Sequence, residues 1–234
     1  MEKFLIDFLE HPQNKTDVLS VDAGPVITIS RECGCSSHNI AIKLAKILSG
    51  YSFHTDRKHN VEWIWVNKEV IEKAAVELNM SPEMIKGVFL KEARQSLHEV
   101  TTAFSMDKVY DAEDQQVIDT LSDVIRQLAI KGNCIIVGRG SNILANDIQS
   151  KLRIKLQAPF DWRVNRIREK SSMSISEAQD YVLEIDRQRD LMVEHIAGRK
   201  LDNNDFDLIF NCAGFNDAQV VETILHALKS KRLI

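Results

Sequence analysis

The chain has 234 residues, of which 44% are hydrophobic, and its 34 acidic and 30 basic residues give a formal net charge of −4. This length and apolar content are enough for one sizeable core, while the charge balance argues against a general binder of nucleic acid or membrane surfaces. No apolar run is long enough to span a bilayer, and the four cysteines have neither disulfide-framework nor zinc spacing. We therefore expect reduced thiols and a cytoplasmic protein.

The first segment, residues 1–24, is predicted to be a helical extension of the main fold. Its large apolar residues share one helical face: Phe4, Leu5, Phe8 and Leu9. Acidic residues interrupt that face, which is a poor pattern for a signal peptide and a fair one for a docking helix. A contact with a second copy of the chain is one possible use of this segment.

A β-branched run over residues 25–30 leads into a short polar loop and then into an apolar-periodic helix. Strand, small-residue loop and helix together aim backbone N–H groups and a helix N-terminus at a phosphate. The predicted phosphate-binding residues span this loop: Ser30, Gly34, Cys35, Ser36, Ser37, His38 and Asn39. The alternative is an ordinary strand-to-helix turn in which Ser36 or Ser37 caps the helix. The loop lacks the lysine of the signature G-x-x-x-x-G-K-[ST], so it predicts anion binding more strongly than catalysis.

Three later apolar runs are predicted to be buried parallel strands: Cys134–Val137, Leu152–Leu156 and Asp207–Asn211. Amphipathic helical segments separate the runs, for example residues 114–131, which stop at Gly132. This alternation predicts an α/β three-layer sandwich with a central parallel sheet of about five strands, in which Val26–Ser30 is central. Ligands of such sheets bind at the carboxyl ends of the strands.

Two regions do not fit the sheet and are predicted to be helical inserts. Residues from about 67 to 103 have a helical pattern throughout, and residues 162–199 are helical and unusually rich in arginine. The arginine-rich insert has a second interpretation, as a solvated helix whose basic and acidic residues pair with one another.

Short motifs follow one another along the chain: Ile29–Ala41, Ile136–Gly140, Ala158–Arg166, Asp186–Arg189 and Phe206–Asn211. With these motifs in this order, the sequence resembles the cytidylate kinase-like family, a divergent branch of the P-loop nucleoside monophosphate kinases. The resemblance implies one kinase-like domain over residues 25–234. Within it, an acceptor-binding insert would cover about 55–105 and a lid about 162–199.

The resemblance also implies a reaction, in which ATP or GTP with Mg²⁺ phosphorylates a nucleoside monophosphate or a similar small phosphorylated acceptor. It assigns catalysis to Arg31, Arg139 and Arg189, and contacts in the acceptor site and lid to Arg163, Arg166 and Asp186. Arg139 would hold the acceptor phosphate, unless it is a surface arginine that pairs with a carboxylate. Asp186 and Arg189 are three residues apart on a helix and could instead pair with each other. No residues of this sequence are predicted as a dedicated metal site.

The chain departs from true cytidylate kinases in its first loop, where Ser36 and Ser37 stand at the positions of a glycine and the lysine. We therefore predict measurable nucleotide binding with weak or undetectable CMP kinase activity. Two alternatives use the same fold without catalysis. One is a nucleotide or anion sensor, and the other is an assembly protein that buries Trp63 and Trp65, or the N-terminal apolar face, in a homodimer.

Overall fold

The computed structural model describes residues 24–54, 62–66 and 112–234. The chain divides into two units, one of residues 1–17 and 69–124 and the other of residues 18–68 and 125–234. Helix α6 (Ala112–Lys131) begins in the first unit and ends in the second. The second unit holds the sheet and the candidate site. The predicted N-terminal helix and most of the predicted acceptor-binding insert lie outside the described residues.

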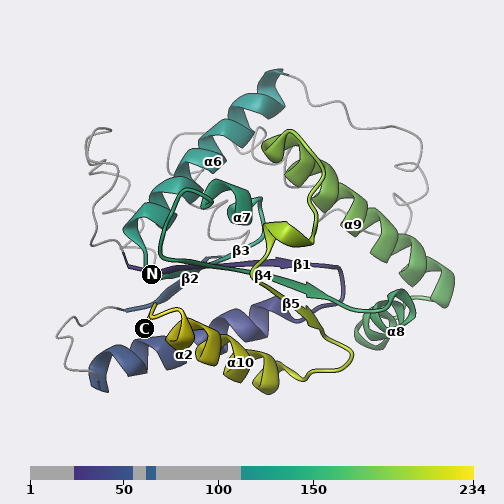
Figure 1. Cartoon of the computed structure of the whole chain (residues 1–234). Coiled ribbons are helices and arrows are strands. Elements are labelled where there is room, and N and C mark those ends of the chain that lie inside the picture. The colour runs from purple at the N-terminus through teal and green to yellow at the C-terminus, as the bar shows by residue number, and fades with distance from the viewer. Residues whose placement is uncertain (1–23, 55–61, 67–111) are drawn as a thin grey trace. The chain divides into compact units, whose positions relative to one another are not determined.

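Five strands form one parallel sheet in the order β2-β3-β1-β4-β5 (Figure 1). Their bounds are Val26–Arg31 for β1, Ile64–Val66 for β2, Cys134–Val137 for β3, Lys151–Gln157 for β4 and Leu208–Asn211 for β5. The predicted α/β fold with a central first strand is confirmed. Sequence did not predict β2, which is only three residues long.

Helices cover both faces of the sheet. Besides α6, they are α2 (Ser37–His54), α7 (Ser141–Leu144), α8 (Phe160–Lys170), α9 (Ile175–Ala197), the 3₁₀ turn Asn203–Asp205 and α10 (Asp217–Ser230). Figure 1 shows α2 and α10 on one face and α7 and α9 on the other. The first face is closed by an apolar cluster that joins α2 and α10 to β1, β3 and β4.

Alternation along the strands decides which side chains can reach a ligand. Ile27 and Ile29 of β1 and the even-numbered residues of β4 point into the apolar cluster under α2 and α10. Because successive side chains of a strand point to opposite faces, Ser30 of β1 and Lys155 of β4 point toward α9. The sheet is therefore apolar on one face and carries polar groups on the other, near its carboxyl end.

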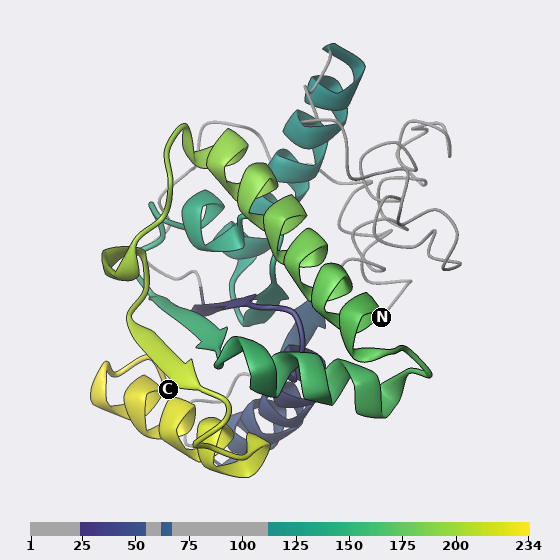
Figure 2. The ribbon, with the colours of Figure 1, turned by 90° about the vertical axis from the view of Figure 1, so that its right-hand side faces the viewer.

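The predicted arginine-rich insert forms two helices, α8 and α9. In Figure 2, α8 follows the arrowhead of β4 and lies beside the beginning of α9. A small apolar cluster holds the pair together, and it includes Val164 of α8, Val182 of α9 and Cys33 of the first loop. Ser174 caps α9 through a reciprocal pair of hydrogen bonds with Glu177. No described helix is long and apolar enough to cross a bilayer.

Candidate functional site

The loop between β1 and α2 is a tight turn over residues 32–36, as the sequence predicts. Gly34 has a φ of +90°, and a Cβ there would lie 3.2 Å from both the Cβ and the carbonyl oxygen of Arg163. Only glycine fits this conformation and this close approach without strain. The turn delivers the chain to Ser37, the first residue of α2.

Much of the loop backbone is already bonded within the protein. The N–H groups of Cys35 and Ser37 donate to the carbonyls of Glu32 and Cys35, at 3.2 and 3.0 Å. The N–H of Cys33 donates to Oδ1 of Asp186 at 2.6 Å. A carboxylate of α9 therefore accepts one amide N–H of the loop, a charge-assisted hydrogen bond.

Arg163 of α8 ties the loop to α9. Its side chain is buried, and its Nε lies 3.0 Å from the carbonyl oxygen of Ala158 and 3.2 Å from Oε2 of Glu32. Its Nη1 donates to the carbonyl oxygen of Cys33 at 3.3 Å and to the carboxylate of Asp186. Glu32 in turn accepts the N–H of Ala158 at 3.0 Å. We call Glu32, Arg163, Asp186 and the bonded backbone of Cys33 and Ala158 the loop network.

Arg166, one turn further along α8, also reaches the loop. Its guanidinium donates to the hydroxyl of Ser36 and stacks over the ring of Trp162, with Cζ 4.9 Å from the ring centroid. His38 makes an edge-to-face contact with Trp65 at 4.8 Å between centroids. Trp63 is buried in the chain's own core, so it offers no surface to a second copy.

The turn after β3 is unusual, because three consecutive residues have positive φ: Gly138 (78°), Arg139 (58°) and Gly140 (66°). For Arg139 this conformation costs about 1–2 kcal/mol. A Cβ at Gly138 would collide with the guanidinium of Arg31, so glycine permits that close approach. Arg139 itself is buried, and its Nη1 lies 3.5 Å from Sδ of Met192. Backbone strain of this kind is often held at binding sites.

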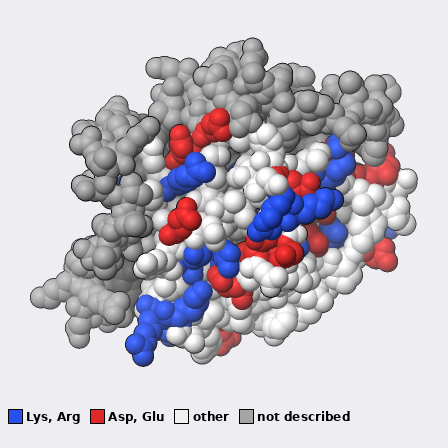
Figure 3. All heavy atoms as spheres, turned by 45° about the horizontal axis from the view of Figure 1, so that its top comes forward, with Lys and Arg blue, Asp and Glu red and all other residues white. Residues whose placement is uncertain are grey.

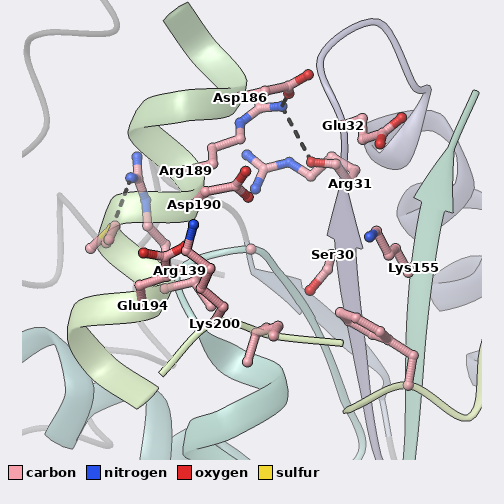
Figure 4. Close-up of a pocket in the computed structure, with 16 residues that line it drawn as sticks. Ser30, Arg31, Glu32, Arg139, Lys155, Asp186, Arg189, Asp190, Glu194 and Lys200 are labelled. Carbon is pink, nitrogen blue, oxygen red and sulfur yellow. Dashed lines mark hydrogen bonds and ion pairs between the residues drawn. The ribbon is translucent and has the colours of Figure 1, made fainter. Parts of the chain in front are cut away.

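A pocket of about 330 Å³ opens between α9 and the carboxyl ends of β1 and β3. Its lining is Ser30, Arg31, Glu32, Gly138, Arg139, Gly140, Lys155, Asp186, Arg189, Asp190, Met192, Val193, Glu194, Lys200, Leu201 and Phe206. Figure 4 shows the polar side chains arranged around it. Figure 3 shows acidic and basic side chains interleaved over one face of the described residues. The pocket is thus a mixed but densely charged site.

The structure divides the sequence-predicted site residues into two groups. One group lines the pocket: Ser30, Arg31, Arg139, Asp186 and Arg189. The other lies on the loop, on the first turn of α2 and on α8, outside the pocket lining: Gly34, Cys35, Ser36, Ser37, His38, Asn39, Arg163 and Arg166. Asp186 and Arg189 do approach each other, at 3.8 Å, but Asp186 also belongs to the loop network.

Sequence reasoning missed several residues of the pocket: Lys155, Asp190, Glu194, Lys200 and Phe206. The sequence could have indicated two of these residues. Asp190 and Glu194 follow Asp186 at intervals of four, so they share its helix face. Burial raises the pKa of Asp190, and the nearby Asp186 carboxylate raises it further while Lys155 opposes the shift.

Oxygen donors are present for a magnesium ion that accompanies a nucleotide. Among the described residues, no three His, Cys, Asp or Glu side chains are grouped to hold a metal ion by themselves. Mg²⁺ in kinase sites needs only one or two protein oxygens, because water and phosphates supply the rest. The Ser30 hydroxyl and the Asp190 carboxylate, both in the pocket, are hard oxygen donors that fit this requirement.

Three thiols lie around the loop. Burial raises the pKa of Cys33 to about 11. The thiols of Cys35 and Cys212 are hydrogen-bonded to each other, which raises the pKa of Cys35 and lowers that of Cys212. This contact joins the loop to the residue that follows β5.

Comparisons with known proteins agree with this architecture. The model of the cytidylate kinase-like family matches residues 26–213. An uncharacterized protein from Eubacterium ventriosum ATCC 27560 has a similar solved structure, with a TM-score of 0.62 and 17% identity over 88% of this chain and 98% of that one. Shikimate kinase from Acinetobacter baumannii in complex with shikimate gives a TM-score of 0.49 and 11% identity over 90% and 96%. The chain has no match among curated proteins.

Proposed function

We propose that this chain, which belongs to the cytidylate kinase-like family, transfers the terminal phosphoryl group of ATP or GTP to a nucleoside monophosphate or a similar small phosphorylated acceptor. One observation carries the proposal: basic side chains from four separate parts of the fold converge on one pocket. They are Arg31 of β1, Arg139 of the turn after β3, Lys155 of β4 and Arg189 of α9. Phosphoryl transfer depends mainly on positioning and on positive charge around the moving group.

Each part of the site has a role in this proposal. The donor nucleotide lies with its phosphates against the residue 34–39 loop and the N-terminus of α2, where orphan amides favour an anion. Arg139 binds the phosphate of the acceptor, since a guanidinium can contact two phosphate oxygens at once. Arg31 and Arg189 line the pocket and add positive charge to it.

The loop network and α9 position these groups. Arg163 and Asp186 fix the loop against α9, and the hydrogen bond from Nη1 of Arg189 to the carbonyl oxygen of Arg31, at 3.4 Å, fixes α9 against β1. When bound with the nucleotide, Mg²⁺ supplies further charge neutralisation at the phosphates. Ser30 and Asp190 would hold it. Closure of α9 over the pocket also excludes water, which protects the transferred group from hydrolysis.

A second function, a non-catalytic nucleotide or anion sensor, is favoured by a different observation. The loop has no lysine, and the amide of Cys33 is already bonded to the Asp186 carboxylate. A nucleotide phosphate that needs this amide must displace Asp186 and so disturb α9. In a sensor, that disturbance would be the output and no phosphoryl group would move.

Calorimetric titration with ATP and GTP, followed by a coupled assay of ADP release with CMP, separates the two functions. We expect nucleotide binding and slow turnover, because the loop lacks its lysine. Arg139→Ala should lower kcat/KM for CMP at least tenfold and leave nucleotide affinity unchanged, whereas Arg168→Ala, an exposed residue of α8, should change neither. Binding without turnover for any nucleoside monophosphate supports the sensor, and absence of both binding and turnover contradicts both functions.

A further inference from the structure

The first loop lacks the cation that usually contacts the transferred phosphoryl group, so another cation must serve if the proposed reaction occurs. The arginines of the loop and lid are engaged in holding the fold. Arg163 bonds to Glu32 and Asp186, and Arg166 bonds to Ser36. Arg189 bonds to the backbone of Arg31 and lies 3.8 Å from Asp186. None of these three can turn toward a phosphate without breaking a contact that positions α8 or α9.

Lys155 differs from these arginines in its position and its contacts. It lies on β4 directly opposite Ser30 in the parallel register, one strand from the phosphate-binding loop. Figure 4 shows its ammonium directed into the pocket, on the side of Ser30 and Glu32. Within the described residues its contact is with an aromatic ring, not an ion pair: Nζ lies 5.6 Å from the centroid of the Phe206 ring. An ammonium next to an aromatic face retains its charge for a ligand.

The other lysine of the pocket is less suitable for contact with the moving group. The side chain of Lys200 is 86% exposed, and its Nζ lies 3.9 Å from a carboxylate oxygen of Glu194. A cation so exposed is screened by water and fixes nothing in place. Lys155, in contrast, is only partly exposed and rises from β4, an interior strand of the sheet that pairs with the central strand β1.

We propose that Lys155 is a catalytic residue that contacts the transferred phosphoryl group and supplies the positive charge that the loop does not. This inference rests on the proposed function. In the transfer, an acceptor phosphate oxygen bonds to the γ-phosphorus while the bond from that phosphorus to the β,γ-bridging oxygen breaks, and the nucleoside diphosphate leaves with the electron pair. Lys155 keeps its proton throughout, and its N–H groups donate to the oxygens of the moving group.

The test compares three variants of the full chain: Lys155→Met, Lys155→Arg and Lys46→Met. Lys46 lies on the exposed side of α2, so its replacement removes the same charge far from the pocket lining. Removal of one well-placed donor from a transition-state site costs about a hundredfold in kcat. We expect that loss for Lys155→Met, with the acceptor KM within threefold of the native chain and the nucleotide KM raised by no more than about tenfold. Lys155→Arg should recover at least tenfold of the loss, and Lys46→Met should match the native chain.

Binding of inorganic tripolyphosphate, measured by calorimetry, tests the same contact without turnover. Lys155→Met should weaken it about tenfold, while thermal unfolding stays within a few degrees of the native chain. If Lys155→Met changes neither kcat nor tripolyphosphate binding, Lys155 does not contact the phosphoryl group and the inference is wrong. An increase of the acceptor KM alone, with kcat unchanged, also overturns it, because Lys155 would then hold the acceptor.

The proposed function and this inference can fail separately. If the native chain catalyses the transfer and Lys155→Met does not lower kcat, the proposed function stands and the inference about Lys155 is wrong. A native chain that binds tripolyphosphate but transfers nothing loses the function, and the tenfold weakening by Lys155→Met then supports Lys155 as a phosphate contact. A native chain that neither turns over nor binds tripolyphosphate contradicts both.

Discussion

Two groups of charged residues flank the end of β1, and they differ in how their charges are satisfied. In the loop network, Arg163 meets two carboxylates and two backbone carbonyls, and each carboxylate also accepts a backbone N–H. In the pocket, Lys155 faces the ring of Phe206, with its Nζ 5.6 Å from the ring centroid. The charges of the loop network pair directly with one another, whereas Lys155 forms no direct ion pair among the described residues.

This difference separates two tasks that a single loop performs in other phosphate sites. Charges that are paired and buried fix geometry, because each has a partner only in one arrangement. A charge that forms no direct ion pair, such as that of Lys155, keeps the free energy that a bound anion can use. The comparison predicts that variants of the loop network lose stability and that variants of the pocket lose ligand binding.

The largest expected effect is that of Arg163→Met. Removing one partner of a buried ion pair leaves the others desolvated and costs about 3 kcal/mol of unfolding free energy. Urea denaturation of the variant and of Lys200→Met, which breaks an exposed pair, measures the difference. We expect the Lys200 variant to lie within about 0.5 kcal/mol of the native chain.

Lys155→Met belongs in the same denaturation series and sharpens the comparison. Because Lys155 forms no direct ion pair among the described residues and acts on Asp190 only at longer range, its loss should change stability by no more than about 0.5 kcal/mol. Equal destabilisation by the Arg163 and Lys155 variants would contradict the division between a structural and a binding group of charges.

A smaller effect is expected from the backbone of the loop. Gly34→Ala places a Cβ 3.2 Å from backbone and side-chain atoms of Arg163 at a φ of +90°, so we expect a loss of about 1–2 kcal/mol. Gly50→Ala is the matched control, since Gly50 lies in α2 and a Cβ there has no neighbour within 4 Å. Alanine should stabilise that helical position by about 1 kcal/mol. A lower unfolding temperature for Gly34→Ala together with a higher one for Gly50→Ala supports a loop that α8 holds rigidly. A higher unfolding temperature for Gly34→Ala would refute it.

Sequence patterns predicted most of the fold because its strongest signals are local. Continuous apolar runs marked β1 and β3, and helical periodicity with Gly132 marked the end of α6. Strand β2 was not predicted because a run of three residues is too short to show a hydrophobic period. Its place in the sheet comes from pairing with β3, which is remote in sequence. The insert at 162–199 was correctly predicted to be helical, but helical periodicity alone does not show its division into α8 and α9, which depends on the capping residue Ser174.

The site was less predictable because it depends on which face each residue occupies. The run Leu152–Leu156 was interpreted as a strand buried on both faces, whereas its alternation of apolar and basic residues is the pattern of a half-buried strand. That alternation would have placed Lys155 on the ligand side. The pairing of Arg163 with Glu32 and Asp186 joins residues more than twenty positions apart, so no local pattern contains it.

The smallest expected effect concerns the thiols on the loop side. Burial raises the pKa of Cys33 to about 11 and that of Cys134 to about 12, while the hydrogen bond from Cys35 lowers that of Cys212. Because the thiolate is the reactive form and access to it is also required, iodoacetamide at pH 8 should leave the buried Cys33 and Cys134 intact in the folded chain, and any alkylation should fall on Cys35 or Cys212. Peptide mass spectrometry after timed quenching measures the order.

The same shifts predict how stability depends on pH. An unfolded cysteine ionises near its ordinary pKa of about 9, whereas folded Cys33 keeps its proton until about pH 11. Between these values the folded chain binds more protons than the unfolded chain, so the unfolding free energy falls as pH rises from 9 to 11. Cys33→Ala should flatten this decline while leaving stability at pH 7 reduced by the lost packing between α8 and α9. An unchanged decline in that variant would assign the alkaline loss to other groups, and rapid alkylation of Cys33 at pH 8 would show that the loop network opens more readily than its paired charges imply.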